Sequence, residues 1–262
     1  MMPFKLEDWY IFLLLLLRAS LLLFFIPVMN SRYVPSAVRI VLSLFLAYVG
    51  FIHLETVGLI KTGIPKDFLE LVFIVLREFI FCFSISQVAR IIFYAAELAG
   101  EYISYLMGFS VVNVIDPTSE SSVPIISHLQ SMVLMLLFLL IGGHLWFIKA
   151  YSYSLDVFPV TNVTTIPFNL IRYTIDLLGK IFVLSIYIDA PILIVMIIVQ
   201  FVLAFISRLL PQLNVFMVGF PLQVLVGFIT ILISINTLSI VFGRELLRIR
   251  EYIDDFMRLL SG

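Results

Sequence analysis

Long apolar runs are the feature of this sequence that most limits its fold. About six of them come close to the ~20 residues that a helix needs to cross the hydrocarbon core of a membrane. They lie at approximately 9–28, 38–60, 68–93, 129–148, 177–206 and 215–242, and proline, glycine and asparagine residues separate them. The sequence therefore predicts an all-α membrane-type protein with about six long hydrophobic helices.

The composition excludes several classes of protein. Of the 262 residues, 62% are hydrophobic and 13% are charged, whereas a soluble domain is about 45–50% apolar and about 25% charged, so a soluble enzyme is not expected. A formal net charge of −1 provides no excess of positive charge with which to bind nucleic acid. The single cysteine, Cys82, and three widely spaced histidines predict no disulfide, metal site or cofactor.

Five charged residues fall inside the apolar segments: Arg18, Arg77, Glu78, Arg90 and Asp189. Each costs about 2.5–3.5 kcal/mol near the centre of a bilayer. Arg77 and Glu78 are neighbours, and because successive helical residues diverge by about 100°, we expect them not to pair with each other. Their partners then come from elsewhere, either inside the same bundle or from other subunits.

Both ends of the chain carry topological signals. The first apolar segment has no small-residue cleavage site after it, so we expect it to be retained as a membrane segment. The end of the chain is amphipathic and its charges balance, which favours docking to protein over a membrane surface. Basic residues in this tail favour a cytoplasmic C-terminus.

Small residues recur every fourth position at Ala96, Gly100, Ser104 and Gly108. Such a stripe along one helix face lets another backbone approach closely. The spacing is equally compatible with packing inside the chain and with a contact between subunits.

The stretch from Gly108 to Pro124 is predicted to be a long loop, because Asp116–Pro117 favours a turn and both prolines stop helices. It carries several apolar residues of its own. Nonhelical backbone at membrane depth must be buried in protein or face an aqueous cavity, so a pore plug and a plain surface loop both remain open.

Two further breaks shape the second half of the chain. Gly142–Gly143–His144 is predicted to close the fourth segment, and Asp189–Ala190–Pro191 marks a bend or the start of the fifth helix. Pro211 and Pro221 are expected to end the fifth segment and to kink or start the sixth, which makes a helical hairpin.

Together these motifs resemble the FliR/SctT family of export-gate subunits of bacterial type III secretion. The residues that carry the resemblance are Gly100–Glu101, Gly108–Phe109, Asp116–Pro117, Gly142–Gly143–His144 and the run from Arg208 to Leu222 with Pro211, Gln212, Asn214, Phe216, Gly219, Phe220 and Pro221. Two positions depart from the family pattern: Ser104 replaces a frequent glycine, and Gln223 replaces a frequent lysine.

The resemblance implies a FliP-like part over residues 1–172, fused to a FliQ-like helical hairpin over 173–262. It implies a hetero-oligomeric core with FliP and FliQ, FlhB at the cytoplasmic side, and a place in the bacterial inner membrane at the flagellar basal body. No enzymatic activity is implied: the core would conduct unfolded flagellar proteins passively.

The resemblance also implies roles for particular residues. The plug that seals the closed channel would contain Gly108, Phe109, Val111, Val112, Asn113, Ile115, Asp116 and Pro117. The buried charges Arg77, Glu78 and Asp189 would lie at contacts between subunits.

Other functions compete with this interpretation. The nearest is the equivalent subunit, SctT, of a virulence injectisome, although the Val–Gly–Phe–Pro–Leu ending of the hairpin motif favours the flagellar form. A secondary transporter would use Asp189, Arg77 and Glu78 as midplane sites. An intramembrane enzyme would need a convergent catalytic set, which the spacing of the histidines and serines does not provide.

Overall fold

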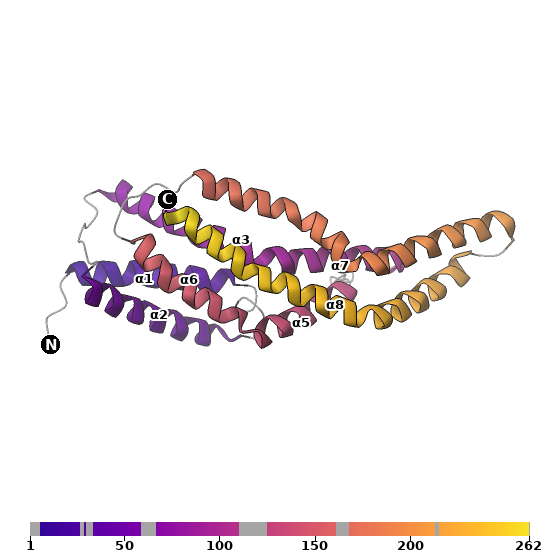
Figure 1. The fold of residues 1–262 in the computed structure, drawn as a ribbon, viewed down its shortest axis with the longest axis horizontal. Helices are drawn as coiled ribbons and strands as arrows, with labels where there is room; N and C mark the ends of the chain where they lie inside the picture. The colour runs from indigo at the N-terminus through magenta and orange to yellow at the C-terminus, as the bar shows by residue number, and fades with distance from the viewer. Residues whose placement is uncertain are drawn as a thin grey trace. The chain divides into compact units, whose positions relative to one another are not determined.

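Every regular element in the described part of the chain is an α-helix. The computed structural model describes residues 6–26, 29, 34–58, 67–109, 125–160, 168–212 and 215–261. In order, the helices are α1 (Leu6–Phe25), α2 (Ser36–Val57), α3 (Phe68–Leu106), α5 (Ile125–Leu140), α6 (Gly143–Val157), α7 (Phe168–Leu209) and α8 (Val215–Ser261) (Figure 1). The predicted all-α class is confirmed.

The predicted count of about six membrane segments is not confirmed among the residues that the structure describes. Four are long and apolar enough to cross a membrane, over Asp8–Phe25, Ser36–Val57, Phe168–Leu209 and Met217–Leu259. A fifth is added only if α5 and α6 count as one broken span. The third predicted segment, 68–93, runs on to Leu106 as α3 and is not among these spans.

Glycines in the left-handed region mark the boundaries of two helices, at the predicted break Gly142 and at Gly58, which lies inside the predicted segment 38–60. Gly142 has φ 72° and separates α5 from α6, so the fourth predicted segment, 129–148, is two helices. Gly58 has φ 68° and ends α2, with its N–H donated to the carbonyl oxygen of Glu55 at 3.2 Å. A residue with a Cβ atom would be strained at either position, which is why glycine stands there.

Prolines inside α7 and α8 do not end these helices. Pro191 lies within α7, which already begins at Phe168, and Pro221 lies within α8, which begins at Val215. Of the two alternatives predicted at Asp189–Ala190–Pro191, a bend or the start of the fifth helix, the helix start is wrong. Proline removes one backbone N–H and crowds the preceding turn, so packing by neighbouring segments must compensate for the lost bond.

The chain divides into two compact units, each with its own buried core. Unit 1 comprises Met1–Ile91, Ile141–Leu178 and Arg248–Gly262; unit 2 comprises Ile92–Leu140 and Gly179–Leu247. Residues of α3, α7 and α8 contribute to both units. These two units are defined by packing. The predicted boundary between residues 172 and 173 instead separates a FliP-like part from a FliQ-like part, and it stays a prediction.

A buried ion pair lies in the core of unit 1. The Arg18 guanidinium in α1 donates from Nε to Glu78 Oε2 at 2.6 Å and from Nη2 to Glu78 Oε1 at 2.8 Å. Both side chains have 0% exposure. The remaining Arg18 nitrogen, Nη1, donates to the Ser154 carbonyl oxygen of α6 at 3.1 Å. This pair therefore links α1, α3 and α6.

Arg77 joins the same cluster, which corrects the expectation that neighbours in a helix would not pair. Its Nη2 donates to Glu78 Oε1 at 2.7 Å and to the carbonyl oxygens of Pro159 and Val160 at 3.2 and 3.1 Å. The Arg77 guanidinium carbon also lies 4.6 Å from the ring centre of Phe158. The Arg77 side chain is long enough to reach the Glu78 carboxylate, although the two residues point in different directions from the helix.

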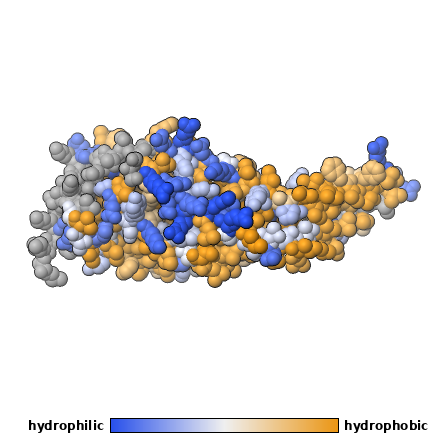
Figure 2. Space-filling view, viewed as in Figure 1, coloured by the Kyte–Doolittle hydropathy of each residue, from blue (hydrophilic) through white to orange (hydrophobic). Residues whose placement is uncertain are grey.

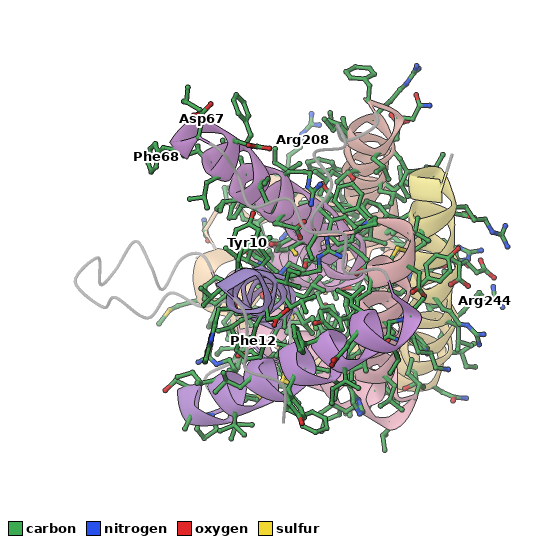
Figure 3. The ribbon with its side chains drawn as sticks, turned by 90° about the vertical axis from the view of Figure 1, so that its left-hand side faces the viewer. Tyr10, Phe12, Asp67, Phe68, Arg208 and Arg244 are labelled. Carbon is green, nitrogen blue, oxygen red and sulfur yellow. The ribbon has the colours of Figure 1, made fainter. Side chains whose placement is uncertain are left out.

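The apolar stripe at the end of α8 is packed against its own chain. Ile253, Phe256 and Met257 are buried, and the Phe256 ring lies 6.1 Å from that of Phe81 in α3. Most of this stripe is therefore covered within unit 1, and the docking of the tail to another protein stays a prediction. The polar side of the helix remains exposed, and Arg244 points away from the ribbon in Figure 3.

Breaking the ion pair should destabilise unit 1. We expect Arg18→Met to lower the free energy of unfolding by about 3–5 kcal/mol, because it leaves the Glu78 carboxylate buried without its strongest partner. Denaturant titration of the detergent-solubilised chain, followed by circular dichroism, measures this loss. Arg172→Met is the matched control, since Arg172 is exposed on α7, and should stay within about 0.5 kcal/mol. Equal losses in both variants would contradict the assignment.

Candidate functional site

The residues at the end of α3, where the predicted plug begins, are fixed by a tight helix ending. The Gly108 N–H donates to the Tyr105 carbonyl oxygen at 3.0 Å, and the Phe109 N–H donates to the Ser104 carbonyl oxygen at 3.1 Å. Gly108 has φ 84°. This pair of bonds around a left-handed glycine is a Schellman ending, which satisfies carbonyls that a helix terminus otherwise leaves free. The chain direction at the start of the loop is therefore set locally.

This helix ending contacts the hairpin motif of α8, within unit 2. The Phe109 ring lies 6.4 Å from the Phe220 ring in an edge-to-face arrangement. A Cβ atom added to Gly108 would lie 3.0 Å from Gln223 Oε1 and 3.1 Å from Phe220 Cδ2. The two motifs that carry the family resemblance, more than one hundred positions apart in the sequence, thus meet in space. We call this contact the plug–hairpin junction.

Two contacts that the sequence did not predict support the junction. Met107 is fully buried, and a Cβ atom added to Gly227 of α8 would lie 2.7 Å from its side chain. Gln200 of α7 donates from Nε2 to the Leu106 carbonyl oxygen at 2.9 Å. The last turn of α3 is therefore held by both helices of the hairpin. An isolated glutamine in an apolar run was the one signal that could have identified Gln200.

Only some of the other predicted plug and hairpin residues lie in the part of the chain that the structure describes. Val111, Val112, Asn113, Ile115, Asp116, Pro117 and Asn214 lie outside the described residues, as does the side chain of Phe216. Pro211 and Gln212 lie in the exposed turn between α7 and α8, and Gly219 is buried on α8. The predicted helical hairpin is present in the described part of unit 2 (Figure 1).

The small-residue stripe packs inside the chain at its centre. A Cβ atom added to Gly100 would lie 2.4 Å from Ser127 Cα and 2.7 Å from the Ser127 backbone nitrogen, at the start of α5. Ala96 is fully buried, and Ser104 Oγ donates to the Gly100 carbonyl oxygen at 2.8 Å. Of the two open alternatives, the structure thus supports packing within one chain for Gly100.

Asp189 also has its partner inside the chain. Both of its carboxylate oxygens accept from Gln130 Nε2, at 3.0 and 2.8 Å, and its exposed fraction is 0%. With Glu78 bonded to Arg18 and Arg77, each of the three buried charges that we expected at subunit contacts has a hydrogen-bond partner within the chain. A role of these residues at contacts between subunits stays a prediction.

The outer face of the hairpin is strongly apolar. Figure 2 shows hydrophobic residues covering the α7 and α8 part of unit 2, and Phe201, Met217 and Ile233 are each more than 70% exposed. A contiguous apolar surface of this kind indicates contact with lipid or with other proteins. The junction thus joins a surface that requires an apolar environment to the end of α3, where the predicted plug begins.

Comparison with known proteins decides the family. Residues 9–249 match the family described as "Bacterial export proteins, family 1". This chain belongs to that family. The match contains the whole plug–hairpin junction, from Gly108 to Gln223.

Flagellar biosynthetic proteins resemble the chain over most of their length. "Flagellar biosynthetic protein FliR" of Bacillus subtilis (strain 168) is 28% identical over 232 residues, 88% of each chain. The protein of that name in Aquifex aeolicus (strain VF5) is 29% identical over 252 residues, 94% of this chain and 95% of its own. That of Escherichia coli (strain K12) is 26% identical over 227 residues, 84% of each. The predicted resemblance to FliR is confirmed.

Enlarging Gly100 should destabilise unit 2 of this bacterial export protein. We expect Gly100→Ala to cost about 1–3 kcal/mol, because the new methyl group would overlap backbone atoms of Ser127. Gly179→Ala is the matched control: Gly179 also lies in a helix, but no atom lies within 4 Å of an added Cβ, so the change should stabilise by about 0.5–1 kcal/mol. Thermal unfolding of the detergent-solubilised proteins measures both. A neutral Gly100→Ala would contradict the close contact.

Proposed function

We propose that this chain is a subunit of the flagellar type III protein export gate, where it helps to form and seal the channel for unfolded flagellar proteins. The observation that carries the proposal is the family match over residues 9–249, with relatives named as flagellar biosynthetic proteins along nearly their full length. Those names favour the flagellar gate over the injectisome alternative.

The geometry of unit 2 supports a sealing role. A plug needs a loop with apolar residues and a rigid base, since a loosely held base would let the loop leave the channel. The Schellman ending at Gly108 and the ring contact between Phe109 and Phe220 supply such a base. In this proposal Val111, Val112 and Ile115 close the lumen by apolar packing, and Pro117 shapes the loop.

The exposed apolar faces support a place in a membrane assembly. We propose a location in the bacterial inner membrane, at the flagellar basal body, in a core with FliP and FliQ and with FlhB at the cytoplasmic side. The N-terminal part would be FliP-like and the C-terminal hairpin FliQ-like. Sister subunits and lipid would then cover residues such as Phe201 and Phe205, which are exposed in the single chain.

Genetic deletion tests the function directly. Cells that lack this chain should lose motility and secrete no flagellar proteins, and the full chain supplied in trans should restore both. Loss of effector secretion with unchanged motility would instead favour the injectisome. Solute flux through the purified chain alone would favour the transporter, with Asp189 as the first residue to change.

Co-purification tests the assembly. A tagged chain extracted in mild detergent should carry two smaller hydrophobic subunits, with this chain present once. A monomer or homodimer, extracted from cells that express the sister subunits, would contradict the proposal.

Removal of the plug should open the assembled gate to ions. We expect deletion of residues 111–122 to raise ion conductance across the membrane, because the apolar side chains that fill the lumen are lost. Conductance of the purified assembly in planar bilayers measures this change. Co-purification of the sister subunits with the deletion variant is the control for assembly. Unchanged conductance in a fully assembled complex would overturn the plug assignment.

A further inference from the structure

A groove of about 640 Å³ lies in unit 1 between α6 and the end of α8. Its floor is apolar: Ala150, Ile253 and Met257 line it, and each is at most 4% exposed. The rim is mostly polar and aromatic, with Ile148 as its one exposed aliphatic side chain among the lining residues; its other members are Trp146, Lys149, Ser152, Tyr153, Asp156, Arg250, Asp254 and Arg258. An apolar centre inside a polar rim is the usual anatomy of a protein–protein interface.

The spacing of the lining residues fits the docking of a helix. On α6, Trp146, Lys149 and Tyr153 recur at three and four residues, and on α8, Arg250, Ile253 and Met257 do the same. Each helix thus presents one face along the groove for about ten residues, or about 15 Å. Two adjacent helices with such faces form the kind of groove into which the side chains of a third helix pack.

The charges of the rim favour an acidic occupant. Arg258 has an interaction within the chain, which leaves the cations Lys149 and Arg250 on the rim beside two carboxylates. One of those carboxylates, that of Asp156, is already engaged at 2.9 Å by His53 Nε2 of α2. Lys149 and Arg250 have no acidic partner among the residues that the structure describes. Tryptophan, tyrosine and arginine are also the residue types that contribute most to binding at interfaces.

We propose that this groove binds an amphipathic helix of another export-apparatus subunit, with apolar side chains on the floor and Asp or Glu side chains against Lys149 and Arg250. The inference rests on the proposed function, since it requires an assembly of several subunits. The α8 wall of the groove, from Arg250 onward, lies beyond residue 249, where the family match ends.

Photocrosslinking in the assembled complex tests the proposal. A benzophenone amino acid at Tyr153, which is 47% exposed on the rim, should crosslink under ultraviolet light to another subunit. Mass spectrometry should place the product on a helical segment with acidic residues. Crosslinking only to lipid, within this chain, or to a second copy of it would overturn the proposal, as would the absence of any product.

Charge reversal supplies the matched comparison. We expect Lys149→Glu combined with Arg250→Glu to reduce the crosslink yield at least fivefold, and the opposite reversal at the crosslinked acidic residues to restore it. Arg172→Glu is the control, because Arg172 is an exposed cation of unit 1 that does not line the groove, and it should leave the yield unchanged. An equal yield in all variants would overturn the proposal.

Co-purification separates this inference from the proposed function. If the tagged chain retains the sister subunits but gives no crosslink from the groove, the docking site is wrong and the export-gate function stands. If the sister subunits are not retained by the unmodified chain, the export-gate function itself is contradicted.

Discussion

The core of unit 1 depends on the bidentate ion pair between Arg18 and Glu78, whose side chains are both fully buried. A charge in an apolar core is tolerated only when its hydrogen-bonding groups have partners. Because the partners of Arg18 lie on α3 and α6, this requirement brings α1, α3 and α6 together around its guanidinium group. The rings of Phe81 and Phe158 complete the site by covering the Arg18 guanidinium. Arg77 enters the same cluster, so the helices have little freedom to slide past one another.

Unit 2 depends on close backbone approach instead of charge. At Gly100 the absent side chain lets α3 meet the start of α5, and at Gly227 it makes room for Met107. Apolar helices in a membrane environment gain little from the hydrophobic effect against each other, so close packing of small residues must hold them. Gln200 and the Gly108 ending then fix the last turn of α3, from which the predicted plug departs.

These two modes of packing suit a subunit of an export gate. A gate has to hold a loop on a firm base while large apolar faces remain available for lipid or for other subunits. The described residues meet both requirements: Phe109 at the end of α3 contacts Phe220 of α8, and the outer faces of α7 and α8 are uncovered. The groove between α6 and the end of α8 adds a polar-rimmed surface of a different kind, suited to one particular partner.

The sequence by itself determined the all-α class, the membrane character, the glycine break at Gly142 and the family, because each follows from local periodicity, composition or a contiguous motif. Only the tertiary structure decided which partners the buried charges and small residues have. Arg18 and Glu78 are 60 residues apart, and helical spacing alone suggested that Arg77 would avoid Glu78. Spacing along a helix specifies which face a residue lies on, whereas the identity of the facing segment depends on how distant helices pack. For the same reason the sequence left Gly100 open between two kinds of contact, and the backbone of Ser127 resolved it.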